Sequence, residues 1–415
     1  MSLADQASLL LIPSGYKSQK VYSIFPNDGD GDFDFSRSGS ATRIAKNGLI
    51  TTVDSNIPRL EYPLIDGVQN GCPSLLLEPQ STNLITHSSE LTNSSWVKQI
   101  SGTGSAPIVT SNYAISPDGT QNASRVIFDL NGGTTSSDFS QLQNSITATV
   151  GDDYTSSVYM KSNYGSTHSL TFIGVDGSTS IVSVTSQWQR FNVSATLSVA
   201  SMRIRARGSE GSSDVTDVSI WGAQVEEGSF QTSYIPTNGS TVTRNEETCN
   251  GAGDATTFND SEGVLMAEIS ALADDQTRRQ ISVSDGSTDN VVRLHYNDDG
   301  SNIIRFQIRS NSSIEVTRSF SVNDIKEFHK VAIFYRLNDV KFFIDGFEVG
   351  TDTTAAMPSG LSVLQFDQGN GAYRFYGKNK QIQYYNSALT ESELSQLTSW
   401  TSFTDMANGQ QYSIK

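Results

Sequence analysis

The feature that most constrains this chain is a two-residue alternation of apolar and polar side chains, repeated in short runs that turn residues separate. The runs Tyr154 to Met160 and Ile181 to Val184 are examples. Successive side chains of a strand point to opposite faces, so this period is typical of half-buried strands. Long runs at helical spacing are nearly absent. We therefore expect an all-β protein with two tandem antiparallel jelly-roll β-sandwiches, preceded by an irregular β-rich N-terminal region.

The pattern divides the 415 residues into four segments. Residues 1–90 are rich in turn signals and form the irregular region. Residues 91–237 and 251–415 are expected to form the two sandwiches, joined by a linker at 238–250. One helical turn is predicted where Thr390 and Glu393 have the spacing of a capping box.

Composition excludes several classes of protein. The net charge is −16, and no basic stripe is present that could neutralise nucleic-acid phosphates. The arginines of Met202 to Arg207 alternate, which indicates one polar face of a strand. The apolar run Leu9 to Ile12 is too short for a membrane span or a signal peptide. Cys72 and Cys249 are expected to be free and reduced, as in a protein made in a reducing cytoplasm. We expect no nucleic-acid partner and no membrane insertion.

The C-terminal segment carries a series of strand and turn motifs. They are His329 to Tyr335, Lys341 to Gly346, and Tyr385 to Thr390 followed by Glu393. This series resembles the laminin-G-like, concanavalin A-like lectin/glucanase superfamily over about 150 residues. The resemblance implies a β-sandwich and leaves its ligand open.

Two further resemblances cover the rest of the chain. The middle segment resembles a carbohydrate-binding-module-like jelly roll found in phage structural proteins, on Ser116 to Thr120, Trp188 to Phe191, Trp221 to Gly228 and Thr232 to Thr237. The first segment resembles the leading region of tailed-phage virion proteins of the fibre or capsid-appendage type, on Phe33 to Arg37, Pro58 to Tyr62 and Pro73 to Pro79.

Together these resemblances imply a structural appendage of a bacteriophage virion, such as a head fibre, a capsid decoration or a tail fibre. Its N-terminal region would anchor it, and its sandwiches would adhere to host-surface glycans. Such a protein would be assembled in the bacterial cytoplasm and exposed on the particle surface. Its partners would be other virion proteins, bacterial glycans and copies of itself, with a trimer favoured. A stand-alone carbohydrate-binding module and a glycan depolymerase remain as alternatives.

The pattern of acidic residues argues against catalysis. Retaining glycosidases need two carboxyl groups about 5–5.5 Å apart, and in the glucanase branch of the resembled superfamily they lie in a Glu-x-Asp-x-x-Glu arrangement. No Glu-x-Asp occurs in this sequence. Adjacent pairs such as Asp274-Asp275 would point to opposite faces of a strand. We therefore expect no enzyme activity.

Glycan binding needs an exposed aromatic ring together with amide or charged groups for the hydroxyls. Two loops have this composition, and they supply the candidate residues Asn370, Tyr373 and Arg374 in one and Tyr164 and His168 in the other. The alternative for the first loop is that Tyr373 and Phe375 share a buried strand face. We interpret Trp188 and Trp221 as core residues.

Metal binding has one candidate site. Ca²⁺ prefers carboxylate and carbonyl oxygens in loops, and Asp298 and Asp299 lie in a predicted turn. The run Asp28 to Asp34 lacks the glycine and the glutamate of a calcium loop and is interpreted as a polar turn. No cofactor is expected, with Ca²⁺ at Asp298 and Asp299 kept as the alternative.

Overall fold

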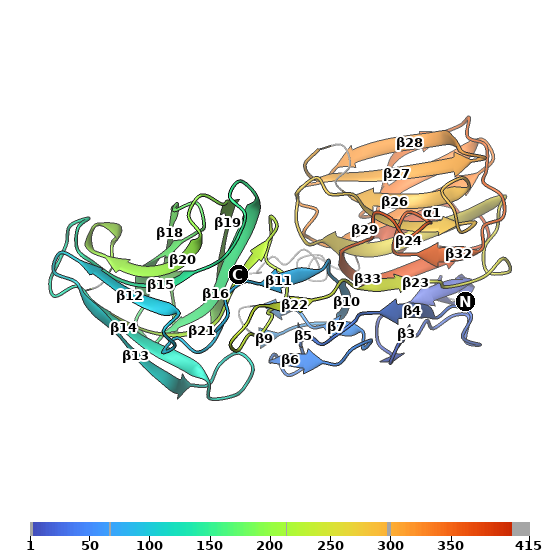
Figure 1. Ribbon diagram of the computed structural model, residues 1–415. Helices are drawn as coiled ribbons and strands as arrows, with labels where there is room; N and C mark the ends of the chain where they lie inside the picture. Colours follow the sequence, from blue (N-terminus) through green and yellow to red (C-terminus); the bar gives the residue numbers. More distant parts are fainter. Residues whose placement is uncertain (1–2, 66–67, 213, 297–299, 401–415) are drawn as a thin grey trace.

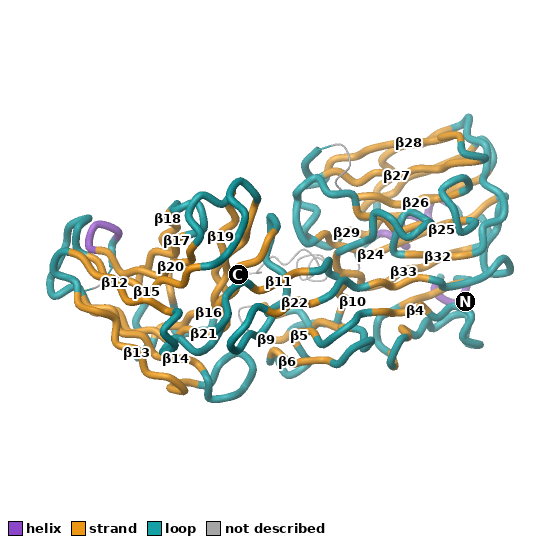
Figure 2. The backbone as a smooth tube through the Cα atoms, in the orientation of Figure 1, coloured by secondary structure: helices purple, strands orange, loops and turns teal. Residues whose placement is uncertain are grey.

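The computed structural model describes residues 3–65, 68–212, 214–296 and 300–400. It confirms the all-β class and its sandwiches. Figure 1 shows the middle segment as one sandwich, in teal and green, and the C-terminal segment as a second, in yellow to red, with the blue N-terminal strands below the second sandwich and beside the first. Strands and loops account for nearly all of the backbone in Figure 2.

The middle sandwich consists of two five-stranded antiparallel sheets. One has the order β12-β15-β20-β17-β18 and the other β13-β14-β21-β16-β19. Their inner faces pack a shared core that includes Val126, Leu142, Val158 and Ile204. The bounds of the strands are Trp96–Ser101 (β12), Ser105–Ala114 (β13), Ala123–Asp129 (β14), Phe139–Ser145 (β15), Asp153–Ser162 (β16), His168–Ile173 (β17), Thr179–Val184 (β18), Gln189–Thr196 (β19), Ser201–Arg207 (β20) and Val215–Glu227 (β21).

The C-terminal sandwich packs a five-stranded sheet, β28-β27-β26-β25-β32, against an eight-stranded sheet. The larger sheet has the order β31-β30-β29-β24-β33-β10-β7, and β1 also pairs with β33. The bounds are Glu262–Ala271 (β24), Arg279–Ser284 (β25), Val291–Tyr296 (β26), Ile303–Ser310 (β27), Ser313–Ser321 (β28), His329–Arg336 (β29), Asp339–Ile344 (β30), Phe347–Asp352 (β31), Val363–Gln365 (β32) and Gly377–Tyr385 (β33).

The N-terminal region supplies strands to this second sandwich. The sequence pattern had assigned these strands to a separate irregular region. Strands β1 (Leu9–Leu11), β7 (Arg59–Glu61) and β10 (Ser74–Leu77) join its larger sheet, because Leu9, Leu75 and Leu77 belong to the same apolar core as β24. The segment expected to be a linker pairs with other strands of the N-terminal region, in two smaller sheets. There β22 (Val242–Arg244) pairs with β11 (Ser81–Asn83), and β23 (Thr248–Asn250) pairs with β4 (Phe33–Ser36).

The remaining elements are short. They are the strands Tyr16–Lys17 (β2), Lys20–Val21 (β3), Ala41–Ile44 (β5), Ile50–Val53 (β6), Leu64–Ile65 (β8) and Val68–Gln69 (β9), the 3-10 turns Ala4–Gln6 and Gly208–Glu210, and the helix Glu391–Thr398 (α1).

Three local predictions are confirmed: the cap of α1, the alternation along β20 and the free cysteines. Thr390 and Glu393 form both hydrogen bonds of the capping box that starts α1. On β20, Met202, Ile204 and Ala206 are buried in the core, and the arginines between them face outward. Cys72 is exposed and Cys249 is buried, and both are free. Among the described residues, no helix is long and apolar enough to cross a membrane.

Candidate functional site

A cavity of about 780 Å³ opens between the two sandwiches. Its volume falls within the range of about 300–1,000 Å³ that is typical of small-molecule sites. One wall comes from the middle sandwich and the opposite wall from the C-terminal sandwich, while β7, β10 and the segment 229–233 close the base. We call this cavity the inter-sandwich cleft.

The first wall is the outer face of β16 and β19. Phe191 and Val193 pack toward the core, so Arg190, Asn192 and Ser194 face the cleft. Asn192 and Ser194 are exposed.

Arg190 is the charged group of this wall. Its guanidinium lies 5.3 Å from the centre of the Tyr159 ring. It donates hydrogen bonds to the carbonyl oxygen of Thr232 (2.7 Å) and to Ser157 Oγ (2.9 Å). Its Nε is buried and has no hydrogen-bond partner within the described ranges. Arg190 is therefore held firmly and still has an unsatisfied donor.

Trp188 lines the cleft beside Arg190 and is partly buried. Its indole N–H donates to the carbonyl oxygen of Ile115 at 3.0 Å, and Lys161 Nζ lies 5.3 Å from the ring centre. Trp221 is buried, as expected of a core residue. Trp188 was also interpreted as a core residue, but it lines the cavity as well. It can do so because it adjoins β19, which lies at the edge of its sheet.

The second wall is the segment 270–275, which comprises the end of β24 and the residues after it, with Lys326 and Lys378 beside it. Asp275 pairs with both terminal nitrogens of Arg279, at 2.8 and 3.0 Å, and accepts a hydrogen bond from Ser229 Oγ at 3.0 Å. Burial alone would raise the pKa of Asp275, but the hydrogen bonds and charge of Arg279 outweigh it and lower the pKa below its ordinary value. Lys378 Nζ lies 3.0 Å from Glu61 Oε2.

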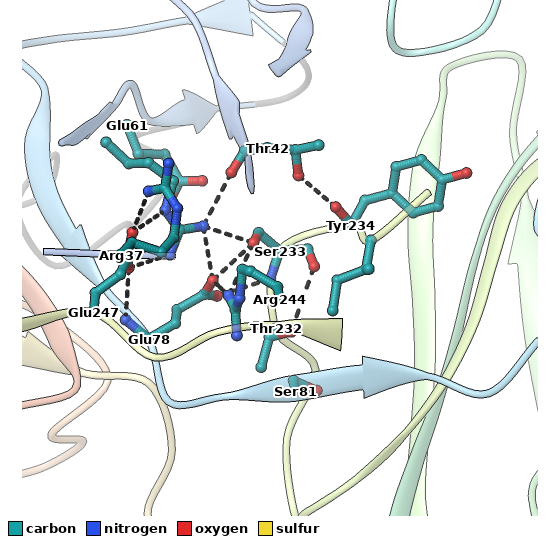
Figure 3. A network of polar contacts seen from close by, with 12 residues as sticks. Arg37, Thr42, Glu61, Glu78, Ser81, Thr232, Ser233, Tyr234, Arg244 and Glu247 are labelled. Atoms are coloured by element: carbon teal, nitrogen blue, oxygen red, sulfur yellow. Dashed lines mark hydrogen bonds and ion pairs between the residues drawn. The ribbon is translucent and has the colours of Figure 1, made fainter. Parts of the chain in front are cut away.

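A buried network of charges supports the base of the cleft (Figure 3). It contains three arginines and two glutamates, all almost completely buried: Arg37, Arg59, Glu78, Arg244 and Glu247. Glu247 accepts from Arg37 Nη1 at 2.7 Å, from Arg59 Nε at 2.8 Å and from the backbone N–H of Glu78 at 3.0 Å. Burial, followed by the charge of Arg59, lowers the pKa of Arg244 to about 9.

Ser233 connects this network to the middle sandwich. Its backbone N–H and its hydroxyl donate to the two carboxylate oxygens of Glu78, each at 2.7 Å, and its hydroxyl also accepts from Arg59 Nη1 at 2.7 Å. Thr42 Oγ1 donates to the carbonyl oxygen of Tyr234 at 2.5 Å. The N-terminal region, the closing segment 232–234 and the segment 244–247 thus form one unit beneath the cleft.

The candidate residues of the middle sandwich differ in exposure. Tyr164 is 76% exposed, whereas His168 is 8% exposed at the start of β17. Burial lowers the pKa of His168 below its ordinary value, and the charge of Asp217 opposes this effect. Tyr164 is thus available to a ligand, and His168 is largely enclosed.

The C-terminal candidate loop runs along β25. Tyr373 is 50% exposed and lies under the guanidinium of Arg278, at 5.1 Å, while Phe375 is buried in the core. The two rings therefore do not share a buried face. Asn370 is exposed, and its side-chain oxygen accepts from the backbone N–H of Ala372 at 3.2 Å. Arg374 pairs with Glu246 at 2.5 Å.

The metal candidates Asp298 and Asp299 lie outside the described residues. Within the described part of the chain, no group of three or more His, Cys, Asp or Glu side chains is arranged to hold a metal ion.

Residues 252–395 match the family model described as the concanavalin A-like lectin/glucanases superfamily. No curated protein matches the sequence significantly.

Solved structures resemble parts of the chain. The Ruminococcus gnavus IT-sialidase CBM40 bound to α2,3-sialyllactose is 21% identical with a TM-score of 0.31, over 36% of this chain and 87% of that chain. Domain 4 of the Geobacillus stearothermophilus arabinanase AbnA, in complex with arabinotriose, is 13% identical with a TM-score of 0.31, over 37% and 73%. A CBM4 structure is 18% identical with a TM-score of 0.20, over 30% and 87%. At these identities the likeness concerns the fold alone. The protein is an all-β chain, and residues 252–395 in its C-terminal sandwich are similar to the concanavalin A-like lectin/glucanases superfamily.

Proposed function

We propose that this protein binds glycans and that the inter-sandwich cleft is its binding site. The observation that carries the proposal is the first wall of the cleft, where the Trp188 ring lies beside Arg190 and Asn192. An aromatic ring can stack on the C–H face of a sugar, while amide and guanidinium groups bind its hydroxyls. Lys326 and Asp274 face this wall and supply further polar contacts.

Two residues that line the cleft also carry an unsatisfied polar atom. Gln231 Oε1 and Arg190 Nε are buried and have no hydrogen-bond partner within the described ranges. Leaving such atoms unpaired costs about 1–3 kcal/mol each. Both atoms are closed to solvent in this structure, so a sugar hydroxyl would reach them only after the two side chains turn toward the cleft.

Glycan hydrolysis is the weaker candidate. The carboxylates that line the cleft are engaged by other groups: Glu61 by Lys378, Glu78 by Ser233, Asp274 by the backbone N–H of Asn302, and Asp275 by Arg279. A general acid needs a raised pKa, whereas the pKa of Asp275 is lowered.

The cleft can be tested on an array of bacterial glycans with the full-length protein. Trp188→Ala and the surface variant Asn192→Ala should each reduce binding about tenfold, which corresponds to roughly 1.4 kcal/mol. Asn370→Ala removes a similarly exposed amide from the C-terminal loop and serves as the matched control. Binding that survives both cleft variants, or that Asn370→Ala abolishes, would refute the assignment to the cleft.

The setting that we propose is the surface of a bacteriophage particle, with the protein as an oligomeric appendage, a trimer being favoured. This part of the proposal rests on the sequence resemblances of residues 33–84 and 221–237. The N-terminal strands are built into the second sandwich, so anchoring would use the outer surface of this region. Mass spectrometry of purified particles tests the setting, and the absence of the protein from them would refute it.

A further inference from the structure

A patch of exposed aromatic side chains lies outside the cleft, on the outer face of the sheet β13-β14-β21-β16-β19. Tyr164 follows β16 and is 76% exposed, and Tyr113 on β13 is 36% exposed. Their hydroxyl oxygens are 3.1 Å apart. The guanidinium carbon of Arg125 lies between them, 4.9 Å from the centre of the Tyr113 ring and 5.5 Å from that of Tyr164. We call Tyr113, Tyr164 and Arg125 the tyrosine platform.

The platform is held in place from below. Arg125 Nε donates to Asp217 Oδ1 at 2.9 Å, and a second guanidinium nitrogen contacts the other carboxylate oxygen. Asn163 Nδ2 donates to Asp217 Oδ1 at 2.7 Å. Tyr164 itself has a φ of +59°, a left-handed conformation that is costly for a residue with a large side chain. The exposed ring is therefore presented by a strained turn on a fixed base.

Strand register connects the platform to the cleft. Arg125 lies opposite Ser219, and Ser219 lies opposite Lys161, so the three residues form one row across β14, β21 and β16. Lys161 Nζ then lies 5.3 Å from the ring centre of Trp188, which lines the cleft. Three strand spacings of about 4.8 Å give roughly 14 Å from Arg125 to Trp188. This length suits several linked sugar rings and exceeds one.

Two cations between the platform and the cleft, Lys161 and Arg190, differ from Arg125 in their partners. Arg125 is neutralised by Asp217. In contrast, neither Lys161 nor Arg190 has a carboxylate partner among residues 3–65, 68–212, 214–296 and 300–400: Lys161 contacts the Trp188 ring, and Arg190 contacts Thr232, Ser157 and the Tyr159 ring. The chain has a net charge of −16, so two neighbouring cations without carboxylate partners form a locally positive surface beside aromatic rings.

We propose that the ligand is an acidic polysaccharide chain that runs from the tyrosine platform, past Lys161, into the inter-sandwich cleft. A sugar ring stacks on Tyr164, and carboxylate groups of the chain pair with Lys161 and Arg190. This inference rests on the proposed function and specifies its ligand class. It also makes the platform a second subsite that only a long chain can reach.

The test uses the full-length protein and a panel of acidic bacterial capsular polysaccharides, each paired with its carboxyl-reduced form and with short oligosaccharides cut from it. Binding is measured by biolayer interferometry. The variants are Lys161→Gln and Tyr164→Ala. Their controls are Lys98→Gln, an exposed lysine on the opposite sheet, and Phe347→Ala, an aromatic residue that is 74% exposed on the other sandwich. Thermal melting checks that each variant is folded.

We expect wild type to bind at least one acidic polysaccharide about tenfold or more tightly than its reduced form, and Lys161→Gln to remove this preference. Tyr164→Ala should weaken binding of the long chain and leave binding of the short oligosaccharides unchanged. If wild type binds glycans but prefers the reduced forms, or if both variants behave like their controls, the acidic-chain inference is refuted while the proposed function stands. If wild type binds no member of the panel in either form, both are refuted.

Discussion

The buried charge network gives a prediction whose size follows from its geometry. The Glu247 side chain is completely buried and accepts hydrogen bonds from Arg37, from Arg59 and from the backbone N–H of Glu78. In Glu247→Gln, an amide N–H₂ group replaces one carboxylate oxygen, so a donor then faces one of the N–H donors that this oxygen had accepted from. The three buried arginines of the network also keep only one carboxylate, that of Glu78. Removing one partner of a buried ion pair costs about 3–5 kcal/mol. We expect the free energy of unfolding to fall by this amount.

Differential scanning calorimetry measures the effect. At roughly 2–4 °C per kcal/mol for a unit of this size, the melting temperature should fall by about 6–20 °C. Glu348→Gln makes the same chemical change at an exposed position and should leave the melting temperature nearly unchanged. A loss of less than about 1 kcal/mol in Glu247→Gln would refute the view that this network holds the N-terminal region against the segment 244–247.

Three further predictions concern other parts of the chain. Burial works to lower the pKa of His329, but its hydrogen bond and ion pair with Asp345 prevail and raise the pKa above 6.5. A raised folded-state pKa stabilises the protein below about 6.5, and this stability is lost as the pH rises through the folded value. His329→Gln should therefore flatten the fall in melting temperature as the pH rises above about 6.5, and an unchanged pH profile would contradict this. Thr390→Ala removes the N-cap of α1 and should cost about 1 kcal/mol, visible as faster amide exchange at 391–398; equal exchange in both proteins would argue against the cap. Cys72 is exposed, whereas burial raises the pKa of the Cys249 thiol well above its ordinary value, so a thiol reagent should label Cys72 quickly and Cys249 only after unfolding.

The sequence predicted those features that depend on local pattern. Alternation along β20 placed its arginines outside, and the spacing of Thr390 and Glu393 predicted the cap of α1. The motif Lys341 to Gly346 ends in the turn between β30 and β31, where Asp345 and Gly346 both have positive φ.

Features that depend on contacts distant in sequence could not be predicted in this way. Leu9 pairs with Tyr384, which lies near the other end of the chain. A local pattern of apolar and polar residues cannot predict which strands pair over such a separation. The burial of Glu247 is another example, because its partners Arg37 and Arg59 lie about two hundred residues away.

The same limit applies to the candidate site. Trp188 lies at the start of an alternating strand, which is typical of a core residue, and only the position of β19 at a sheet edge beside the second sandwich makes it a cleft residue. The sequence singled out Tyr164 by its loop, but Tyr113 and Arg125 come from other strands and carried no local signal. Sequence reasoning could have noted Lys161 and Arg190 as cations in an acidic chain.

Hydrogen–deuterium exchange of the full-length protein, with and without a polysaccharide that it retains, tests the central claim most directly. The account predicts that bound glycan slows exchange at the two walls and the base of the inter-sandwich cleft, in residues 188–194, 229–233 and 270–275. Protection confined to the loop 367–376, or to β25 through β28, would contradict it.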